Sequence, residues 1–314
     1  MFSAVVLLLS QLLAVQGLYY SDYPILPSYD KAIPADVQEN FVIVGVVVSK
    51  SSLQSNLQSL KLKSVGKYFT DGDYYEEFEG GKLCSAEIAN TPAVFVAGTG
   101  SIIGSNQFVT AYHVAEELTG DPNLNNVKNL YIVFNYRQKS TGTLEKQSVY
   151  QVAKVVDKSK SEDWVILQTT KGFTHNGGKR FQLASDIPSP NQPIYILGHP
   201  LGMPLRYANG KILDVDTNTN EGLHFISSGF AGNSGSPVVR LSDGKVIGLF
   251  TSYEDGEGAN DFVLNKKCYD YTVSNPNNPI QIKGPLSSKM MSPKVMEAIN
   301  MDYIPDLSEQ HKEL

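Results

Sequence analysis

Residues 232–238, Gly232-Asn233-Ser234-Gly235-Ser236-Pro237-Val238, place Ser234 in a tight turn with glycine on both sides. Glycine has no side chain that would clash, so the backbone of this turn can bend sharply. A serine hydroxyl becomes an effective nucleophile when a nearby base takes its proton as it attacks. The turn therefore makes Ser234 a candidate nucleophile, and another part of the chain has to supply the base.

Two other segments supply the residue types that such a serine needs. The run Phe108-Val109-Thr110-Ala111-Tyr112-His113-Val114 is typical of a strand that ends at a histidine, and Glu162-Asp163-Trp164-Val165-Ile166-Leu167 places an aspartate at the entrance to an apolar strand. Alone, a histidine is more often structural, and an aspartate before a strand is usually a turn or cap residue. Together with Ser234 they give the chain order His113, Asp163, Ser234.

The chain around these motifs is rich in short β-branched and aromatic runs bounded by Gly, Asn, Asp and Pro, which is the pattern of β-strands. They form two sets, separated by the polar stretch 172–191. The first set is 93–97, 100–103, 108–111, 130–136, 149–156 and 164–168, and the second is 194–197, 205–215, 223–227, 237–240, 246–252 and 269–273. Ser292-Pro293 then begins a short helix over 294–300. The sequence predicts an all-β fold of two units, over 86–185 and 186–300, the second including the helix.

Composition argues against several classes of function. The chain has 32 acidic and 26 basic residues, so its net charge of −6 disfavours binding to nucleic acid phosphates. Two cysteines cannot form a tetrahedral zinc site, and the sequence has no His-Glu-x-x-His helix and no phosphate-binding glycine loop. The remaining histidines lack the spacing of metal ligands: His175, His199, His224 and His311. We therefore expect no metal and no cofactor.

Residues 1–17 have the features of a secretory signal peptide. They contain no charged side chain and an apolar stretch of the length of a signal-peptide core, with small residues suited to cleavage after Gly17. The alternative is a short membrane anchor. The longest later apolar run, Phe41–Val48, is too short to cross a bilayer, so we expect no membrane span in the mature chain.

The other end, 301–314, is a tail whose last residues, His311-Lys312-Glu313-Leu314, resemble the KDEL and HDEL retrieval signals, with Lys in place of the usual Asp. With a signal peptide, this predicts the endoplasmic reticulum lumen and a KDEL-type retrieval receptor as partner. The alternative is a chance charged tail on a secreted protein. In such a compartment Cys84 and Cys268 are expected to form a disulfide, and the alternative is two buried thiols.

The segment 18–85 is an N-terminal extension of unclear role. It contains one strong strand candidate, Phe41–Val48, and a possible helix over 52–62. An acidic aromatic run follows at 71–79. That run is interpreted either as a docking or inhibitory segment or, more simply, as a solvated loop.

Taken together, the three motifs resemble the trypsin/chymotrypsin-like serine peptidases, most closely the branch of HtrA-type and staphylococcal glutamyl (V8-like) endopeptidases. The order His–Asp–Ser differs from the orders in α/β-hydrolases and subtilisins. Gly98-Thr99-Gly100-Ser101-Ile102-Ile103 is similar to the family's first hairpin, and Gly198-His199-Pro200-Leu201-Gly202 to a segment where relatives often carry an aromatic at position 199. The resemblance covers about residues 90–260 and implies two six-stranded antiparallel β-barrels of the chymotrypsin type.

The resemblance implies a serine endopeptidase that acts on polypeptides through an acyl-enzyme. His113 would take the proton of Ser234 and deliver it to the leaving amine, and Asp163 would orient the imidazole. The backbone N–H groups of Gly232 and Ser234 would form the oxyanion hole. The alternatives are a catalytically silent binding or chaperone-like module on the same fold, and an esterase that uses the same triad.

Substrate selection is predicted from positions that bind substrate in relatives. Ser228 stands at the floor of the specificity pocket, where the absence of Asp disfavours Lys or Arg at P1 (the residue before the scissile bond). Phe250 and Thr251 occupy the later pocket strand, where glutamyl relatives place a His. Phe250 would offer an apolar wall, so we expect a small or medium apolar P1 residue.

Activation by a new N-terminus, as in trypsin-type zymogens, is not expected. Those zymogens carry an Asp before the nucleophile, and here the residue is the uncharged Asn233. Ile43-Val44-Gly45 is superficially similar to such a new N-terminus, but no basic residue precedes it.

Overall fold

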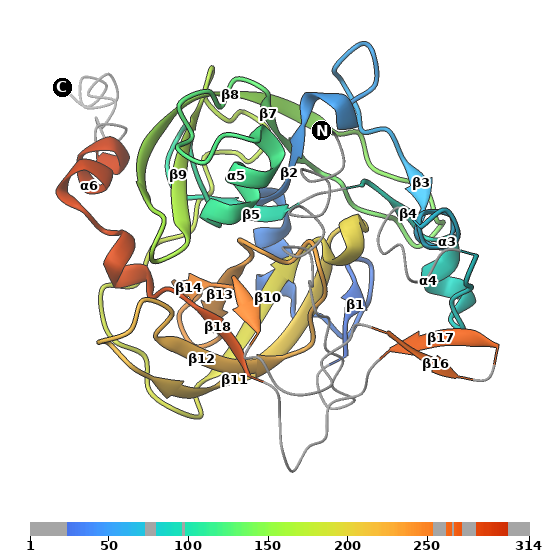
Figure 1. Cartoon of the computed structure of the whole chain (residues 1–314). Helices are drawn as coiled ribbons and strands as arrows, with labels where there is room; N and C mark the ends of the chain where they lie inside the picture. Colours follow the sequence, from blue (N-terminus) through green and yellow to red (C-terminus); the bar gives the residue numbers. More distant parts are fainter. Residues whose placement is uncertain are drawn as a thin grey trace, which may run out of the picture.

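The structure is a computed structural model that describes residues 24–72, 80–95, 98–253, 262–265, 267–271 and 281–300. The expected signal peptide, the C-terminal tetrapeptide and most of the acidic aromatic run lie outside these residues. Strands dominate the described chain and form two main sheets (Figure 1). No helix among the described residues has the length and hydropathy needed to span a bilayer.

The first sheet is a closed antiparallel barrel with the strand order β2-β5-β6-β9-β8-β7. Its strands are β2 (Val44–Ser49), β5 (Gly98–Ile102), β6 (Gln107–Thr110), β7 (Leu130–Phe134), β8 (Ser148–Ser159) and β9 (Trp164–Thr169). Aromatic side chains fill its interior: Phe108, Phe134 and Tyr150 are buried and pack edge-to-face. The helix α5 (Tyr112–Thr119) follows β6.

The first barrel begins earlier in the chain than residue 86, which corrects the expected boundary. Its first strand is β2, from the segment 18–85, and β2 pairs with both β5 and β7. Of the expected strand 93–97, the described residues contribute only Ala93, in β4 (Pro92–Ala93), which pairs outside the barrel with β3 (Lys63–Ser64). β2 takes the barrel position because its residues from Val44 to Val48 are all buried.

Residues 50–97 are consequently an insertion between two paired strands of the barrel. The described part of this insertion, residues 50–72 and 80–95, contains η2 (Lys50–Ser52), α3 (Val65–Thr70) and α4 (Ala86–Asn90), besides β3 and β4. No helix covers 52–62, so that expectation was wrong. In Figure 1, α3 and α4 lie beside the hairpin β16–β17 (Phe262–Asn265 and Cys268–Tyr271). A disulfide between Cys84 and Cys268 joins the insertion to this hairpin, with Cα atoms 5.0 Å apart. The expected disulfide is therefore confirmed.

The second sheet follows the order β14-β13-β10-β11-β12-β18-β15. Its strands are β10 (Pro193–Gly198), β11 (Arg206–Val215), β12 (Leu223–Ser227), β13 (Pro237–Arg240), β14 (Val246–Leu249), β15 (Ser252–Tyr253) and β18 (Ile282–Gly284). Only Phe250 and Thr251 separate β14 from β15, and Thr251 donates its N–H to Lys283 of β18 at 3.0 Å. The sheet therefore curls back on itself, and the two-barrel fold implied by the resemblance is confirmed.

The remaining elements cover the two sheets. The helix α6 (Pro293–Asn300) confirms the expected C-terminal helix, and Ser292 caps it by accepting from the N–H of Val295 at 3.3 Å. Val295 belongs to one buried apolar cluster with Trp164 of the first barrel. The N-terminal strand β1 (Leu26–Pro27) pairs with β11. Short helical turns complete the described chain: α2 (Ala35–Gln38), η1 (Glu39–Ile43), η4 (Pro200–Gly202) and η5 (Ser287–Met290).

Candidate active site

His113 and Asp163 meet because β6 and β9 are neighbours in the first barrel. Thr110 lies opposite Val165, so the end of β6 lies beside the start of β9. Ala111 then leads into α5, whose first turn carries His113. The backbone N–H of His113 donates to Asp163 Oδ1 at 2.9 Å, and the imidazole Nδ1 bonds to Asp163 Oδ2 at 2.6 Å. Two of the three predicted catalytic residues are therefore in direct contact.

This contact determines which imidazole nitrogen can act as a base. An ionised carboxylate only accepts hydrogen bonds, so Nδ1 of His113 carries the hydrogen and Nε2 keeps a lone pair. Asp163 adopts a left-handed backbone with φ +55°. Such a conformation costs a non-glycine residue about 1–3 kcal/mol and persists where neighbouring contacts hold it. Its two hydrogen bonds to His113 provide those contacts.

Acidic groups around His113 favour its charged form. Burial opposes the imidazolium, but the hydrogen bond and charge of Asp163, with the charges of Glu117 and Glu221, outweigh burial and raise the pKa of His113 above its usual 6.5. Glu117 lies one helical turn along α5. Glu221 accepts hydrogen bonds from the hydroxyls of Thr251 at 3.1 Å and Ser252 at 2.8 Å. The site is thus suited to stabilise a positive imidazolium.

A raised pKa of His113 predicts the acid limb of the pH profile. Below that pKa the imidazole is already protonated and cannot accept the serine proton, so activity falls as the pH is lowered through it. We expect kcat/KM for a neutral peptide to show an acid limb with an apparent pKa above 6.5. The measurement is kcat/KM between pH 5 and 9, and a limb at or below 6.5 would contradict the electrostatics described above.

The serine turn packs against the segment that leads into His113. Thr99 on β5 donates its N–H to the carbonyl of Ser234 at 2.8 Å, and Gly235 donates to the carbonyl of Phe250 at 2.7 Å. Gly235 has φ +84°, and a Cβ on it would lie 2.7 Å from the backbone nitrogen of Ala111. Only glycine permits this approach. The structure therefore brings Ser234 from the second barrel to the end of β6, where the chain enters the helix that carries His113.

The predicted oxyanion donors lie in the same turn. Gly232 has φ +91°, and a Cβ there would lie 2.4 Å from the carbonyl oxygen of His199. Among the described residues, the N–H groups of Gly232 and Ser234 donate no backbone hydrogen bond. Both donors are thus available for an oxygen that becomes negative as Ser234 attacks its carbonyl carbon.

Comparison with known families agrees with this geometry. Residues 98–249 match the family model of the trypsin-like peptidase domain. The matched segment runs from the first residue of β5 to the last residue of β14 and includes His113, Asp163 and Ser234. The strand β2, the insertion and the β16–β17 hairpin lie outside it.

Thr99 is a site residue whose contacts were not predicted from the sequence. Its fully buried side chain donates to the carbonyl of Gly232 at 2.7 Å and accepts from the N–H of His199 at 3.0 Å. With its backbone bond to Ser234, Thr99 connects the first barrel to the segment that carries the predicted oxyanion donors. The only signal in the sequence is the Gly98-Thr99-Gly100 run, which does not reveal partners about 100 and 133 residues away.

The residues predicted to select substrate are buried. Ser228 and Phe250 are each 1% exposed and Thr251 is 5% exposed. The Phe250 ring packs against Gly229, where a Cβ would lie 2.6 Å from it, and belongs to the apolar core of the second sheet. Phe250 therefore fills space beneath Gly229, which corrects its expected place as a wall of an open pocket. The Thr251 hydroxyl is occupied by Glu221, a residue that the sequence analysis did not single out.

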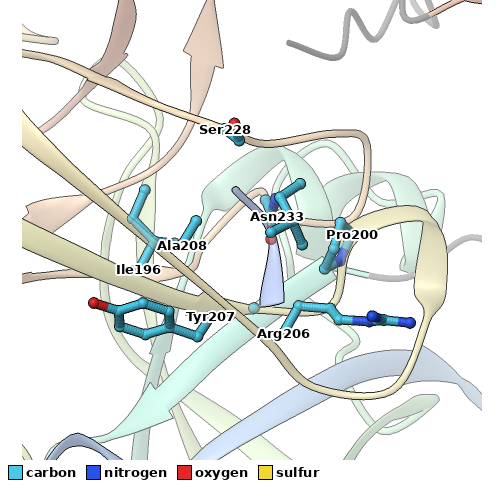
Figure 2. Close-up of a pocket in the computed structure, with 9 residues that line it drawn as sticks. Ile196, Pro200, Arg206, Tyr207, Ala208, Ser228 and Asn233 are labelled. Carbon is cyan, nitrogen blue, oxygen red and sulfur yellow. The ribbon is translucent and has the colours of Figure 1, made fainter. Parts of the chain in front are cut away.

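Asn233 lines a pocket beside the serine turn (Figure 2). The pocket is lined by Ile25, Ile196, Gly198, Pro200, Arg206, Tyr207, Ala208, Ser228 and Asn233. The sequence Ile43-Val44-Gly45 lies elsewhere, from the end of η1 into β2, where Gly45 pairs with Gly100. This segment is an internal part of the barrel. That activity needs no new N-terminus at residue 43 remains a prediction.

The other described histidines have protein partners. His175 donates from Nε2 to the carbonyl of Val42 at 2.8 Å, and His224 contacts Gln281. His199 donates from Nδ1 to the carbonyl of Met203 at 3.0 Å. Within the described residues, no group of three His, Cys, Asp or Glu side chains is placed to hold a metal ion. His311 lies outside those residues.

The buried imidazole of His199 predicts acid sensitivity of the fold. Burial lowers its pKa to about 4, against 6.5 when exposed. As the pH falls from 6.5 to 4, His199 therefore takes up a proton in the unfolded chain but not in the native chain, and the free energy of unfolding decreases. The total decrease from this group is about 3 kcal/mol.

We expect His199→Phe to lack this loss, because phenylalanine can stack on Tyr136 as His199 does, at 5.5 Å, but does not titrate. Denaturant unfolding of both proteins at pH 7 and pH 4 provides the measurement. His175, whose pKa burial also lowers, is present in both proteins and cancels in the comparison. Parallel pH dependence of the two proteins would show that His199 does not contribute.

Proposed function

We propose that this protein is a serine endopeptidase that hydrolyses peptide bonds through His113, Asp163 and Ser234 and an acyl-enzyme intermediate. The observation that supports it most is the pair of hydrogen bonds between Asp163 and His113, at 2.9 and 2.6 Å, beside the serine turn. The His113 side chain is 41% exposed, so solvent can satisfy its ring nitrogens. An aspartate with a purely structural role would therefore not need to bond to this imidazole. The same bond is what a general base requires, since it orients the ring and stabilises its positive form.

The chemistry follows from these positions. Ser234 Oγ attacks the carbonyl carbon of the scissile bond while its proton passes to Nε2 of His113. The carbonyl oxygen becomes negative and accepts from the N–H groups of Gly232 and Ser234. The C–N bond then breaks as His113 gives its proton to the leaving amine. Water repeats the sequence, with His113 taking its proton, and releases the acid and Ser234.

Three finer assignments belong to this proposal. The relationship is closest to the HtrA-type and V8-like branch, supported by the Gly98–Ile103 and Gly198–Gly202 segments. The site of action is the lumen of the endoplasmic reticulum, with a KDEL-type receptor as partner, supported by residues 1–17 and 311–314, and secretion is the alternative. The Cys84–Cys268 disulfide is consistent with either compartment.

Matched substrates distinguish the peptidase from its alternatives. A peptide p-nitroanilide and the p-nitrophenyl ester of the same acyl peptide share one acyl-enzyme. An endopeptidase hydrolyses both, and the ester shows a burst of nitrophenol equal to the enzyme concentration. Hydrolysis of the ester alone would favour an esterase. No hydrolysis of either, and no reaction with a fluorophosphonate, would favour a silent binding module.

A further inference from the structure

The turn η4 (Pro200–Gly202) touches the backbone that carries the first oxyanion donor. Leu201 donates its N–H to the carbonyl of Ala231 at 2.5 Å. A trans peptide directs its carbonyl and its N–H to opposite sides. The bond to Ala231 therefore directs the N–H of Gly232 away from η4, which is the orientation that an oxyanion donor needs.

Leu201 adopts an unfavourable backbone conformation at this position. Its φ is +53°, in the left-handed region that leucine rarely adopts. Such strain persists only where surrounding contacts over-determine the conformation, so other segments must hold this turn in place.

The described part of the insertion, residues 50–72 and 80–95, supplies one set of contacts. Gly202 accepts from the N–H of Val94 at 2.9 Å, and also from the hydroxyl of Tyr136 at 3.0 Å. A Cβ on Gly202 would lie 1.9 Å from the carbonyl oxygen of Val94. The turn and the end of the insertion are thus in such close contact that no methyl group fits at Gly202.

An apolar cluster joins the same two segments. Leu201, Met203 and Phe230 from the second half of the chain are buried together with insertion residues Val65, Tyr68, Phe69 and Ala93. The insertion also reaches β11, where Glu87 on α4 pairs with the buried guanidinium of Arg206 at 3.5 Å. The insertion therefore packs against the turn.

The disulfide joins the insertion to the β16–β17 hairpin. Cys84 donates its N–H to the carbonyl of Tyr269 at 2.9 Å, and Tyr269 donates to Lys82 at 2.7 Å. The Tyr269 ring also packs on Phe69, at 5.4 Å between ring centres. The Cys84–Cys268 bond lies next to these contacts and fixes the insertion to the β16–β17 hairpin.

We propose that the insertion, clamped by Cys84–Cys268, positions the oxyanion hole through the contacts Val94–Gly202 and Leu201–Ala231, so that catalysis depends on the disulfide. Leu201 and Gly202 are positioning residues in this scheme, since they act through the peptide of Gly232 and touch no reacting atom. This inference rests on the proposed function, because it names what orients the donors of that site.

Gly202→Ala tests the contact, and Gly244→Ala is its matched control. Both glycines have positive φ, +66° and +69°, so both substitutions introduce the same backbone strain. Gly202→Ala also clashes with Val94, whereas a Cβ on Gly244 meets nothing within 4 Å.

We expect Gly202→Ala to lower kcat by about 10²–10³-fold, the usual effect of losing one oxyanion donor. KM and the acid limb set by His113 should stay unchanged, since neither depends on that donor. Gly244→Ala should retain kcat within about twofold, as a surface substitution does. A folded Gly202→Ala protein with the kcat of the control would overturn the proposal, and so would an equal loss in both variants.

Reduction of the disulfide provides a second measurement that needs no new variant in the turn. Dithiothreitol gives two electrons and two protons to the S–S bond, leaving the thiols of Cys84 and Cys268 and a cyclic disulfide of the reagent. We expect kcat to fall at least about tenfold with KM little changed, and the Cys84→Ser/Cys268→Ser protein to match the reduced wild type and ignore dithiothreitol. If Gly202→Ala fails to fold, this measurement decides.

An unchanged kcat after reduction, with two thiols counted per chain, would overturn the proposal. If the proposed function itself were wrong, the oxidised wild type would show no activity that depends on Ser234. That result differs from activity that is present but insensitive to reduction.

Discussion

Ser234→Ala is expected to lower kcat/KM for peptide substrates by at least about 10⁴-fold, because it removes the attacking oxygen and leaves only binding and the oxyanion donors. The fold should survive. The Ser234 side chain is replaced by a smaller one, and the turn is held by backbone bonds from Thr99 and Gly235 that alanine retains.

Ser236→Ala is the matched control, since it makes the same change two residues further along the turn. Ser236 is fully buried, and its hydroxyl has no hydrogen-bond partner among the described residues. Loss of that hydroxyl should leave kcat/KM within about threefold of wild type. Progress curves with a fluorogenic peptide provide the measurement. If Ser234→Ala keeps more than about one hundredth of the activity, or if both variants lose equally, Ser234 is not the nucleophile.

Asp163→Asn is expected to lower kcat by about 10⁴-fold, because an amide in place of the carboxylate leaves the His113 imidazole in the wrong tautomer. It should also lower the pKa of His113, since the hydrogen bond and charge of Asp163 are the main causes that raise it. The residual activity should therefore have its acid limb at lower pH than wild type, which a merely unfolded variant would not show.

Glu162→Gln removes a neighbouring carboxylate and serves as the control for Asp163→Asn. Glu162 accepts from the indole of Trp164 at 2.9 Å and makes no contact with His113 in the described structure. We expect its kcat and acid limb to stay near those of wild type. An acid limb that does not move in Asp163→Asn would mean that another group sets the pKa of His113.

The strands were largely predictable because short apolar and β-branched runs carry a local signal. The runs 130–136 and 164–168 correspond to β7 and β9 within a few residues. The sixth barrel strand was assigned to the wrong segment, because 93–97 and Phe41–Val48 have similar local patterns. The choice between them depends on pairing with β5 and β7, and partners 50 to 90 residues away leave no local trace.

The candidate site was predictable at the level of residue types and not at the level of contacts. His113, Asp163 and Ser234 stand in short motifs with distinctive neighbours, and the first two proved to be hydrogen-bonded. Leu201 acts through its backbone N–H, which every residue except proline possesses, so its identity carries no signal. Thr99 acts through its hydroxyl, but its partners lie about 100 and 133 residues away, so no local pattern reveals them. Phe250 was expected at the substrate pocket, but a strand residue can face either side, and here the barrel core takes the ring.

The role of Ser234 as nucleophile is tested most directly by locating the residue that a fluorophosphonate modifies. The oxidised wild-type protein is treated with the probe at several pH values, digested and mapped by mass spectrometry. We expect one adduct, on Ser234 Oγ, and its rate of formation should rise with pH through the raised pKa of His113. Absence of an adduct, or an adduct on another residue with Ser234 unmodified, would contradict this expectation.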